Sequence, residues 1–167
     1  MTDVISIDPH DMARPSSDEP SELALIELLF FAYRDFVSDP DALLAQYDFG
    51  RAHHRVLHFV SRHPGLRVAD LLDILRITKQ SLGRVLKQLI DAGFIDQRPG
   101  PRDRRQRLLY VTETGAALAH RLIEMQSRRI RAALAAVPAE RRAGAEEFLR
   151  GIIDGGERAK VARLIES

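Results

Sequence analysis

The pattern of apolar and polar positions predicts helices over most of the chain. The first periodic segment, residues 21–38, is apolar around nearly its whole circumference, with Ser21 as a candidate N-cap and Asp39-Pro40 as the expected end. A helix that is apolar on all sides must be buried on all sides, and a chain of 167 residues has little other mass to cover it. The pattern favours burial of this helix against a second subunit, and a central core helix within one subunit is the alternative.

A second helix is predicted over residues 50–62 and ends at His63-Pro64-Gly65. A third is predicted over residues 69–75. Only Arg76-Ile77 separate the third helix from another helix, for which Thr78 is a suitable N-cap. In that helix Leu82, Val85, Leu86 and Leu89 recur at the helical period, and the opposite face is polar. Two helices joined by so short a turn form an αα corner.

Gly93 then ends the helix, and two short strands follow over residues 94–98 and 107–111. Between them, Pro99-Gly100-Pro101 and a polar loop form the tip of a hairpin. Thr112 is a candidate cap for a long helix to about residue 136, and shorter helices are expected over 139–153 and 157–165. The expected fold class is therefore mainly α with a small β-hairpin wing, that is, a winged helix-turn-helix lobe plus a helical dimerisation region.

Charge is strongly polarised along the chain. Residues 1–48 hold 11 acidic and 2 basic side chains, whereas residues 76–107 hold nine basic and three acidic ones. A compact basic segment is what a polyanion-binding surface requires, because each neutralised phosphate releases counterions. A solvated basic face is the alternative, and genomic base composition can explain why arginine outnumbers lysine 22 to 3.

The basic segment coincides with the polar-faced helix and the hairpin, which together describe a winged helix-turn-helix, a module that places its second helix in the DNA major groove. Gln80 and Arg84 are the best candidates for reading bases, because a glutamine can bond adenine and an arginine guanine through two hydrogen bonds. Arg105, at the hairpin tip, is the candidate for a narrow minor groove. The full set of candidate DNA contacts is Thr78, Lys79, Gln80, Ser81, Arg84, Lys87, Gln88, Arg102, Asp103, Arg104, Arg105 and Arg107.

Residues 78–98, TKQSLGRVLKQLIDAGFIDQR, with Asp103-Arg104-Arg105 and the segment LYVTETG at 109–115, resemble the MarR family of bacterial transcriptional regulators. The wing pattern of that family, D-x-R followed by two aliphatic positions and T-x-x-G, is matched without a gap. Val68 departs from the family, which often has a capping Ser or Thr there. The resemblance implies a homodimer whose N-terminal and C-terminal helices interlock, and it implies that Asp103 orients Arg105 for the minor groove.

On this basis the domains are expected to be a disordered acidic tail over residues 1–20, a helical dimerisation region over 21–48 and 113–167, and a DNA-binding lobe over 49–112. The partners are double-stranded DNA and a second copy of the chain. The resemblance further implies a cleft between the dimer helices and the lobes that binds a small phenolic or aromatic effector. Candidates to line the cleft are Tyr33, Phe36, Tyr47, His53, His54, Arg55 and His58, although packing or a subunit interface is the favoured explanation for most of them.

Several classes of function are excluded. The chain has no cysteine, so disulfides, thiol nucleophiles and thiol redox switches are absent. The most apolar run has 11 residues, too few to span a bilayer, and residues 1–20 are acidic, unlike a secretory signal, so a cytoplasmic location and no membrane partner are expected. No nucleotide-binding, zinc-protease or hydrolase motif is present, and neither enzymatic activity nor a cofactor is expected.

Two alternatives to a ligand-modulated DNA-binding regulator stay open. One is a winged module that binds a protein instead of DNA. The other is a regulator that responds to a metal, haem or protons through the histidines at 53–58, since His54 and His58 share a helix face. Further ligands for a metal would have to come from Asp48, Glu27 or His120, and no metal site is predicted.

Overall fold

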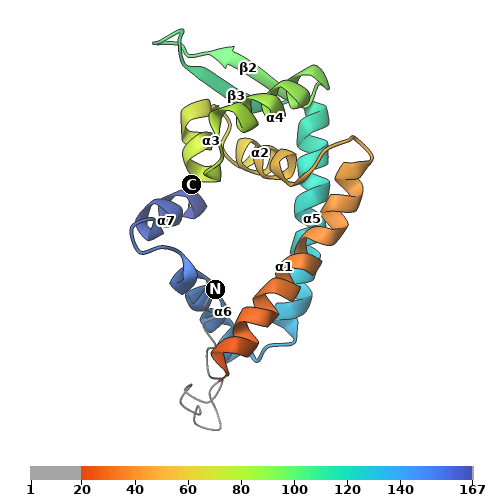
Figure 1. Ribbon diagram of the computed structural model, residues 1–167, viewed down its shortest axis with the longest axis vertical. Helices are drawn as coiled ribbons and strands as arrows, with labels where there is room; N and C mark the ends of the chain where they lie inside the picture. The colour runs from red at the N-terminus through yellow and green to blue at the C-terminus, as the bar shows by residue number, and fades with distance from the viewer. Residues whose placement is uncertain (1–19, 167) are drawn as a thin grey trace, which may run out of the picture. The chain divides into compact units, whose positions relative to one another are not determined.

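The computed structural model describes residues 20–166, so the predicted acidic tail lies outside the described residues except for Pro20. The fold is mainly helical with a small antiparallel sheet, as the sequence predicts (Figure 1). In chain order the elements are α1 (Glu22–Ala45), α2 (Arg51–Arg62), β1 (Leu66–Arg67), α3 (Val68–Leu75), α4 (Lys79–Asp91), β2 (Ile95–Pro99), β3 (Arg107–Val111), α5 (Glu113–Ala135), the 3-10 turn η1 (Ala139–Arg141), α6 (Arg142–Ile152) and α7 (Arg158–Glu166).

The described residues form two compact units, divided between Asp35 and Phe36. The first unit holds the N-terminal half of α1, whose apolar side chains are largely exposed in the single chain. The second unit holds the C-terminal part of α1 and every later element.

The prediction that Asp39-Pro40 ends the first helix is wrong, because α1 continues to Ala45. A proline inside a helix removes one backbone hydrogen bond and costs about 3 kcal/mol. Beyond Pro40, however, the last turn buries Leu43 and Leu44, which are 3% and 0% exposed. Burial of two leucines contributes about 3 to 6 kcal/mol, which offsets the cost of the proline.

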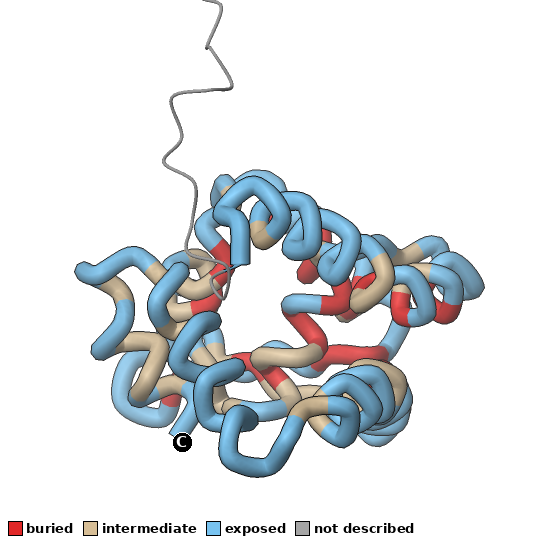
Figure 2. The backbone as a smooth tube through the Cα atoms, turned by 90° about the horizontal axis from the view of Figure 1, so that it is seen from below, coloured by how far each residue is buried: buried red, intermediate tan, exposed pale blue. Residues whose placement is uncertain are grey.

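The core of the second unit lies where α2 packs against α5, α4 and β3. Figure 2 marks the buried stretches of the backbone in red. The large apolar side chains that are fully buried there include Leu44, Leu57, Leu71, Leu82, Leu89, Ile95, Leu109 and Leu122. This one core holds the helix-turn-helix, the sheet and the start of α5 as a winged lobe.

The sheet has three strands in the order β1-β3-β2, one more than the predicted hairpin. In the hairpin, Ile95 lies opposite Val111 and Pro99 opposite Arg107. The strand β1 has only two residues, too few for a sequence pattern, and it forms because Leu66 pairs with Leu109. β2 is an edge strand, so Pro99 can end it without leaving a neighbour unpaired.

The C-terminal part of the chain returns to the winged lobe within the second unit. Arg76, at the turn after α3, forms an ion pair of 3.1 Å with Glu157, and Lys160 of α7 pairs with Asp73 of α3. The helix expected over 139–153 begins as the turn η1 and continues as α6. Among residues 20–166, no helix is both long and apolar enough to cross a membrane.

Candidate nucleic-acid interface

The start of α4 is fixed by the cap that the sequence predicts at Thr78. The backbone N–H of Ser81 donates to the Thr78 hydroxyl oxygen at 3.1 Å, and the Thr78 hydroxyl donates to Ser81 Oγ at 2.8 Å. Arg76 ends α3 in the left-handed region, with φ of 50°. The tight turn between the two helices therefore presents the first turn of α4 at the surface of the lobe.

The two faces of α4 differ as predicted. Leu82, Val85, Leu86 and Leu89 are buried, whereas the opposite face exposes the polar residues Gln80, Arg84, Lys87, Gln88 and Asp91. Lys87 forms an ion pair of 2.6 Å with Asp91, which neutralises its charge locally. Lys79 and Arg84 form no ion pair within the described part of the chain. These two are the cations of α4 that remain available to an external anion.

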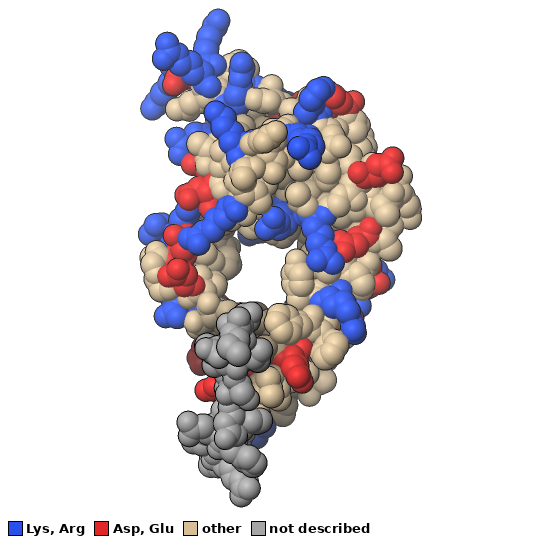
Figure 3. Space-filling view, viewed as in Figure 1, with Lys and Arg blue, Asp and Glu red and all other residues tan. Residues whose placement is uncertain are grey.

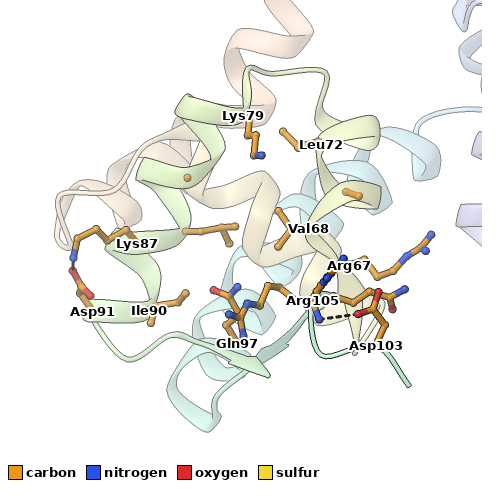
Figure 4. Close-up of a pocket in the computed structure, with 15 residues that line it drawn as sticks. Arg67, Val68, Leu72, Lys79, Lys87, Ile90, Asp91, Gln97, Asp103 and Arg105 are labelled. Carbon is orange, nitrogen blue, oxygen red and sulfur yellow. Dashed lines mark hydrogen bonds and ion pairs between the residues drawn. The ribbon is translucent and has the colours of Figure 1, made fainter. Parts of the chain in front are cut away.

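The hairpin tip exposes four arginines, and among residues 20–166 none of the four forms an ion pair. Asp103 Oδ1 accepts the backbone N–H of Arg105 at 2.9 Å, a contact drawn in Figure 4. Gly100 N–H donates to the Gln106 carbonyl oxygen at 3.0 Å and closes the tip. Asp103 thus holds the backbone of the tip and leaves the guanidinium of Arg105 to solvent. The four arginines are Arg102, Arg104, Arg105 and Arg107.

The T-x-x-G segment fastens α5 to the wing. Thr112 Oγ1 accepts the N–H of Gly115 at 3.0 Å and donates to the Gly93 carbonyl at 2.7 Å. A Cβ at Gly115 would lie 1.9 Å from the carbonyl oxygen of Phe94, so no side chain fits. The motif therefore has a structural role, because it holds the start of α5 against the backbone of Gly93 and Phe94, just before β2.

A groove of about 920 Å³ lies between α3, α4 and the wing. Figure 4 shows Val68 and Leu72 of α3 and Ile90 of α4 on its apolar part, with Lys79 and Arg105 also on its lining. Figure 3 shows Lys and Arg side chains gathered over the wing and the adjoining part of the lobe. A surface with unpaired cations beside a groove suits a long polyanion.

Sequence reasoning missed Arg67, Gln97 and Gln106 as groove residues. Arg67 belongs to the missed strand β1, and its guanidinium is held by both oxygens of Asp70 at 2.7 and 2.6 Å. That interaction raises the pKa of Arg67 and lowers the pKa of Asp70. Arg98 is also engaged, with Asp96 at 3.3 Å and over the ring of Tyr110. Position along the sequence alone does not separate such paired cations from free ones.

The structure brings two of the residues expected at an effector cleft together, because Tyr47 and His53 both stack on Phe49, with ring centroids 5.9 and 4.7 Å away. Tyr33 belongs to the first unit, and Phe36 is half-buried in the second. Tyr47 packs edge-on against Phe94 at 5.4 Å, and Arg55 is exposed.

His53 is buried within the lobe. Its Nδ1 accepts the N–H of Gly50 at 3.0 Å, and its Nε2 lies 2.8 Å from Gln88 Oε1. His58 lines a separate cavity of about 450 Å³, together with Phe59, Ile74 and residues of α7.

Burial lowers the pKa of both His54 and His58, and neighbouring positive groups add to the effect in each case. Within residues 20–166 no three histidine or carboxylate side chains gather closely enough to hold a metal ion. The metal-responsive alternative therefore has no supporting geometry in the part of the chain that the structure describes.

Comparison with known proteins gives a consistent result. Residues 47–106 match a family model described as MarR family. The chain is 50% identical over 129 residues to the HTH-type transcriptional regulator PetP of Rhodobacter capsulatus, covering 77% of this chain and 78% of that protein.

Among solved structures, Streptococcus pneumoniae FabT in complex with DNA has a TM-score of 0.71 at 15% identity, over 79% of this chain and 94% of that one. RV1404 of Mycobacterium tuberculosis has a TM-score of 0.65 at 25% identity, over 85% of this chain and 99% of that one. The structural likeness to FabT supports the fold, and the likeness to PetP reaches over most of both sequences.

Proposed function

The chain belongs to the MarR family of DNA-binding transcriptional regulators, which are not enzymes, and we propose that it acts as a homodimer on a near-palindromic operator. One observation carries this proposal. Six exposed cations of α4 and of the wing tip have no acidic partner among the described residues and belong to the same lobe. They are Lys79, Arg84, Arg102, Arg104, Arg105 and Arg107.

In this proposal α4 enters the major groove with its N-terminal turn toward the bases. Arg84 bonds a guanine through two N–H donors, and Gln80 bonds an adenine. Thr78, Ser81 and Lys79 lie at the same helix end, where backbone N–H groups favour phosphate. Lys87 exchanges its contact with Asp91 for a phosphate. The tip arginines reach the backbone, and Arg105 enters the adjacent minor groove.

The dimer follows from α1. Leu23, Ile26, Leu28, Phe30 and Phe31 are all more than half exposed in the single chain. So much contiguous apolar surface on one helix marks a protein interface. A two-fold axis through that interface would place two lobes on half-sites about 34–36 Å apart. The proposed division into dimerisation helices and a DNA-binding lobe, with boundaries near residues 48 and 113, follows the same logic.

Modulation by a small ligand completes the proposal. The cavity between α2, α3 and α7 is large enough for a small organic molecule, and its lining combines apolar side chains with His58 and Arg76. Occupancy there would alter the contact between α7 and the helix-turn-helix. Repression is the simplest output of a dimer that covers an operator. Such a regulator would act in the cytoplasm, where bacterial DNA lies.

The test is a fluorescence-anisotropy titration of the full chain against duplex DNA from upstream of its own gene, with a scrambled duplex as control. Affinity for the upstream duplex should exceed that for the scrambled one and fall about 1000-fold between about 50 and 200 mM salt. Binding that ignores salt, or that is equal for the two duplexes, would contradict the proposal. A winged module for protein binding would ignore both duplexes.

A further inference from the structure

His53 connects the start of α2 to the exposed face of α4. It is 8% exposed, and its ring stacks on Phe49 with centroids 4.7 Å apart. Both ring nitrogens are engaged, Nδ1 with the backbone N–H of Gly50 at 3.0 Å and Nε2 with Gln88 Oε1 at 2.8 Å. A buried ring with two such contacts has a single orientation.

The position of the ring proton follows from these contacts. A backbone N–H can only donate, so Nδ1 must accept and carries no proton. In the neutral ring the proton is then on Nε2, which must donate to Gln88. Gln88 therefore accepts with its carbonyl oxygen, and its NH₂ group points away from His53. This assignment follows from Gly50 N–H, which donates to His53, which in turn donates to Gln88. It does not depend on distinguishing the oxygen from the nitrogen in the Gln88 amide.

We propose that His53 is a positioning residue that fixes the amide of Gln88 so that Gln88 presents only hydrogen-bond donors to DNA. The proposal rests on the proposed function, since it makes Gln88 one of the contacts of α4. A glutamine held in this way cannot make the paired contact with adenine, which needs both the oxygen and the nitrogen. Its DNA partner must be an acceptor: the N7 of a purine, guanine O6, thymine O4 or a phosphate oxygen.

Gln80 on the same helix provides the contrast. It is exposed, and its side chain makes no hydrogen bond within the described residues. Its amide is free to rotate and to offer both groups to a base. Two glutamines on one face of α4 thus have different recognition chemistry, and the difference originates in α2.

The first test measures the tautomer in the full-length protein without DNA. Long-range 15N NMR of histidine-labelled protein should show a His53 ring with an unprotonated Nδ1 and a protonated Nε2, assigned by comparison with a His53→Gln sample. A proton on Nδ1 would overturn the proposal, because Nε2 would then accept from the amide and turn the carbonyl of Gln88 outward.

The second test uses two replacements of His53 that separate its contacts. In His53→Asn the side-chain oxygen can still accept from Gly50, but the side chain is too short to reach Gln88. In His53→Gln the side-chain NH₂ group can still donate to Gln88. Affinity for the upstream duplex should fall about tenfold for His53→Asn, because a dimer makes the contact between Gln88 and DNA twice. In His53→Gln the affinity should be largely restored. Thermal unfolding of both variants serves as the control for folding.

The third test is a double-mutant cycle with Gln88→Ala. His53→Asn should cause no further loss of affinity in the Gln88→Ala background, because both changes remove the same contact. Losses that multiply, or a Gln88→Ala variant that binds like the wild type, would overturn the proposal while wild-type binding would still support the proposed function. A wild type that does not bind the duplex would instead contradict the proposed function itself.

The same variants show whether the acceptor that Gln88 contacts is a base or a phosphate. If the loss of affinity in His53→Asn is confined to duplexes that retain one base pair, the partner is a base edge. If the loss is uniform across single-base-pair variants and disappears when one phosphate is replaced by a methylphosphonate, the partner is that phosphate.

Discussion

The N-terminal half of α1 and the winged lobe are both highly exposed in the single chain, but their exposed side chains are chemically opposite. α1 exposes leucines and phenylalanines, with Phe30 71% and Leu28 61% exposed, whereas the lobe exposes unpaired cations above a mainly apolar core. An exposed apolar surface is stabilised when another protein surface covers it, and unpaired positive charges are stabilised when a polyanion binds. Each surface therefore indicates the chemistry of its partner: an apolar protein surface for α1 and a polyanion for the lobe.

The largest effect is expected from charges on α1. The double variant Leu28→Glu/Phe30→Glu should be monomeric, because hot-spot side chains at an interface contribute about 2 to 4 kcal/mol each and a buried unpaired carboxylate adds a penalty. Sedimentation analysis should show one chain of 18.8 kDa. Operator affinity should fall at least about 100-fold because one lobe then binds alone. Glu27→Lys on the same helix is the control, and a dimer that survives the double change would refute the role of α1.

A substitution in the interior of the lobe tests the close packing at Gly115. Gly115→Ala should lower the free energy of unfolding by about 3 kcal/mol, because the new methyl group overlaps the Phe94 carbonyl. Gly83→Ala, in α4 with no atom within 4 Å of the new methyl group, should raise it by about 1 kcal/mol. Urea denaturation measures both. Equal changes in the free energy of unfolding for the two variants would contradict the close approach of Gly115 in α5 to the Phe94 carbonyl.

Arg84→Ala tests whether α4 recognises the base sequence of the operator. It should weaken operator binding by about 2 kcal/mol for each guanine that is no longer bonded, and it should relax the preference at one base pair of each half-site. The measurement is competition among duplexes with single-base-pair changes. If preference stays intact while affinity falls, Arg84 contacts phosphate only.

Arg105→Ala should have a smaller and less selective effect, about tenfold for all duplexes, and should reduce the salt slope by about 0.9 for each phosphate that is no longer neutralised. Arg98→Ala is the matched control, because Arg98 is also exposed but already engaged by Asp96 and Tyr110. A decrease in affinity of the same size in both variants would mean that pairing within the chain does not matter for DNA binding.

The smallest effect concerns pH. Burial holds the pKa of His54 and His58 below the ordinary value of 6.5, so the unfolded chain binds more protons than the folded one as pH falls through 6.5. Stability from this source is complete above about pH 6.5 and declines as the pH falls below that value. The urea midpoint should follow that trend, and His54→Asn/His58→Asn should flatten it. A midpoint that rises on acidification would contradict the inferred burial.

Sequence and structure agree best where the determinants are local. The caps at Thr78 and Thr112, the apolar stripe of α4 and the strand over residues 107–111 depend on side chains within a few residues, and all were predictable. Pro40 shows the limit, because the local rule says that a helix ends there and the burial of Leu43 and Leu44 overrides it. The candidate contacts of α4 and the wing could likewise be chosen from sequence, but which cations are already paired could not.

By itself, the sequence determined the succession of helices and the hairpin, the polar face of α4 and the concentration of basic residues around it, because periodicity and composition are properties of neighbours along the chain. Only the tertiary structure decided that His53 bonds Gln88 and that Gly115 touches Phe94. Hydrogen bonds and close packing join residues that are distant in sequence, and their geometry exists only after the core has brought those residues together.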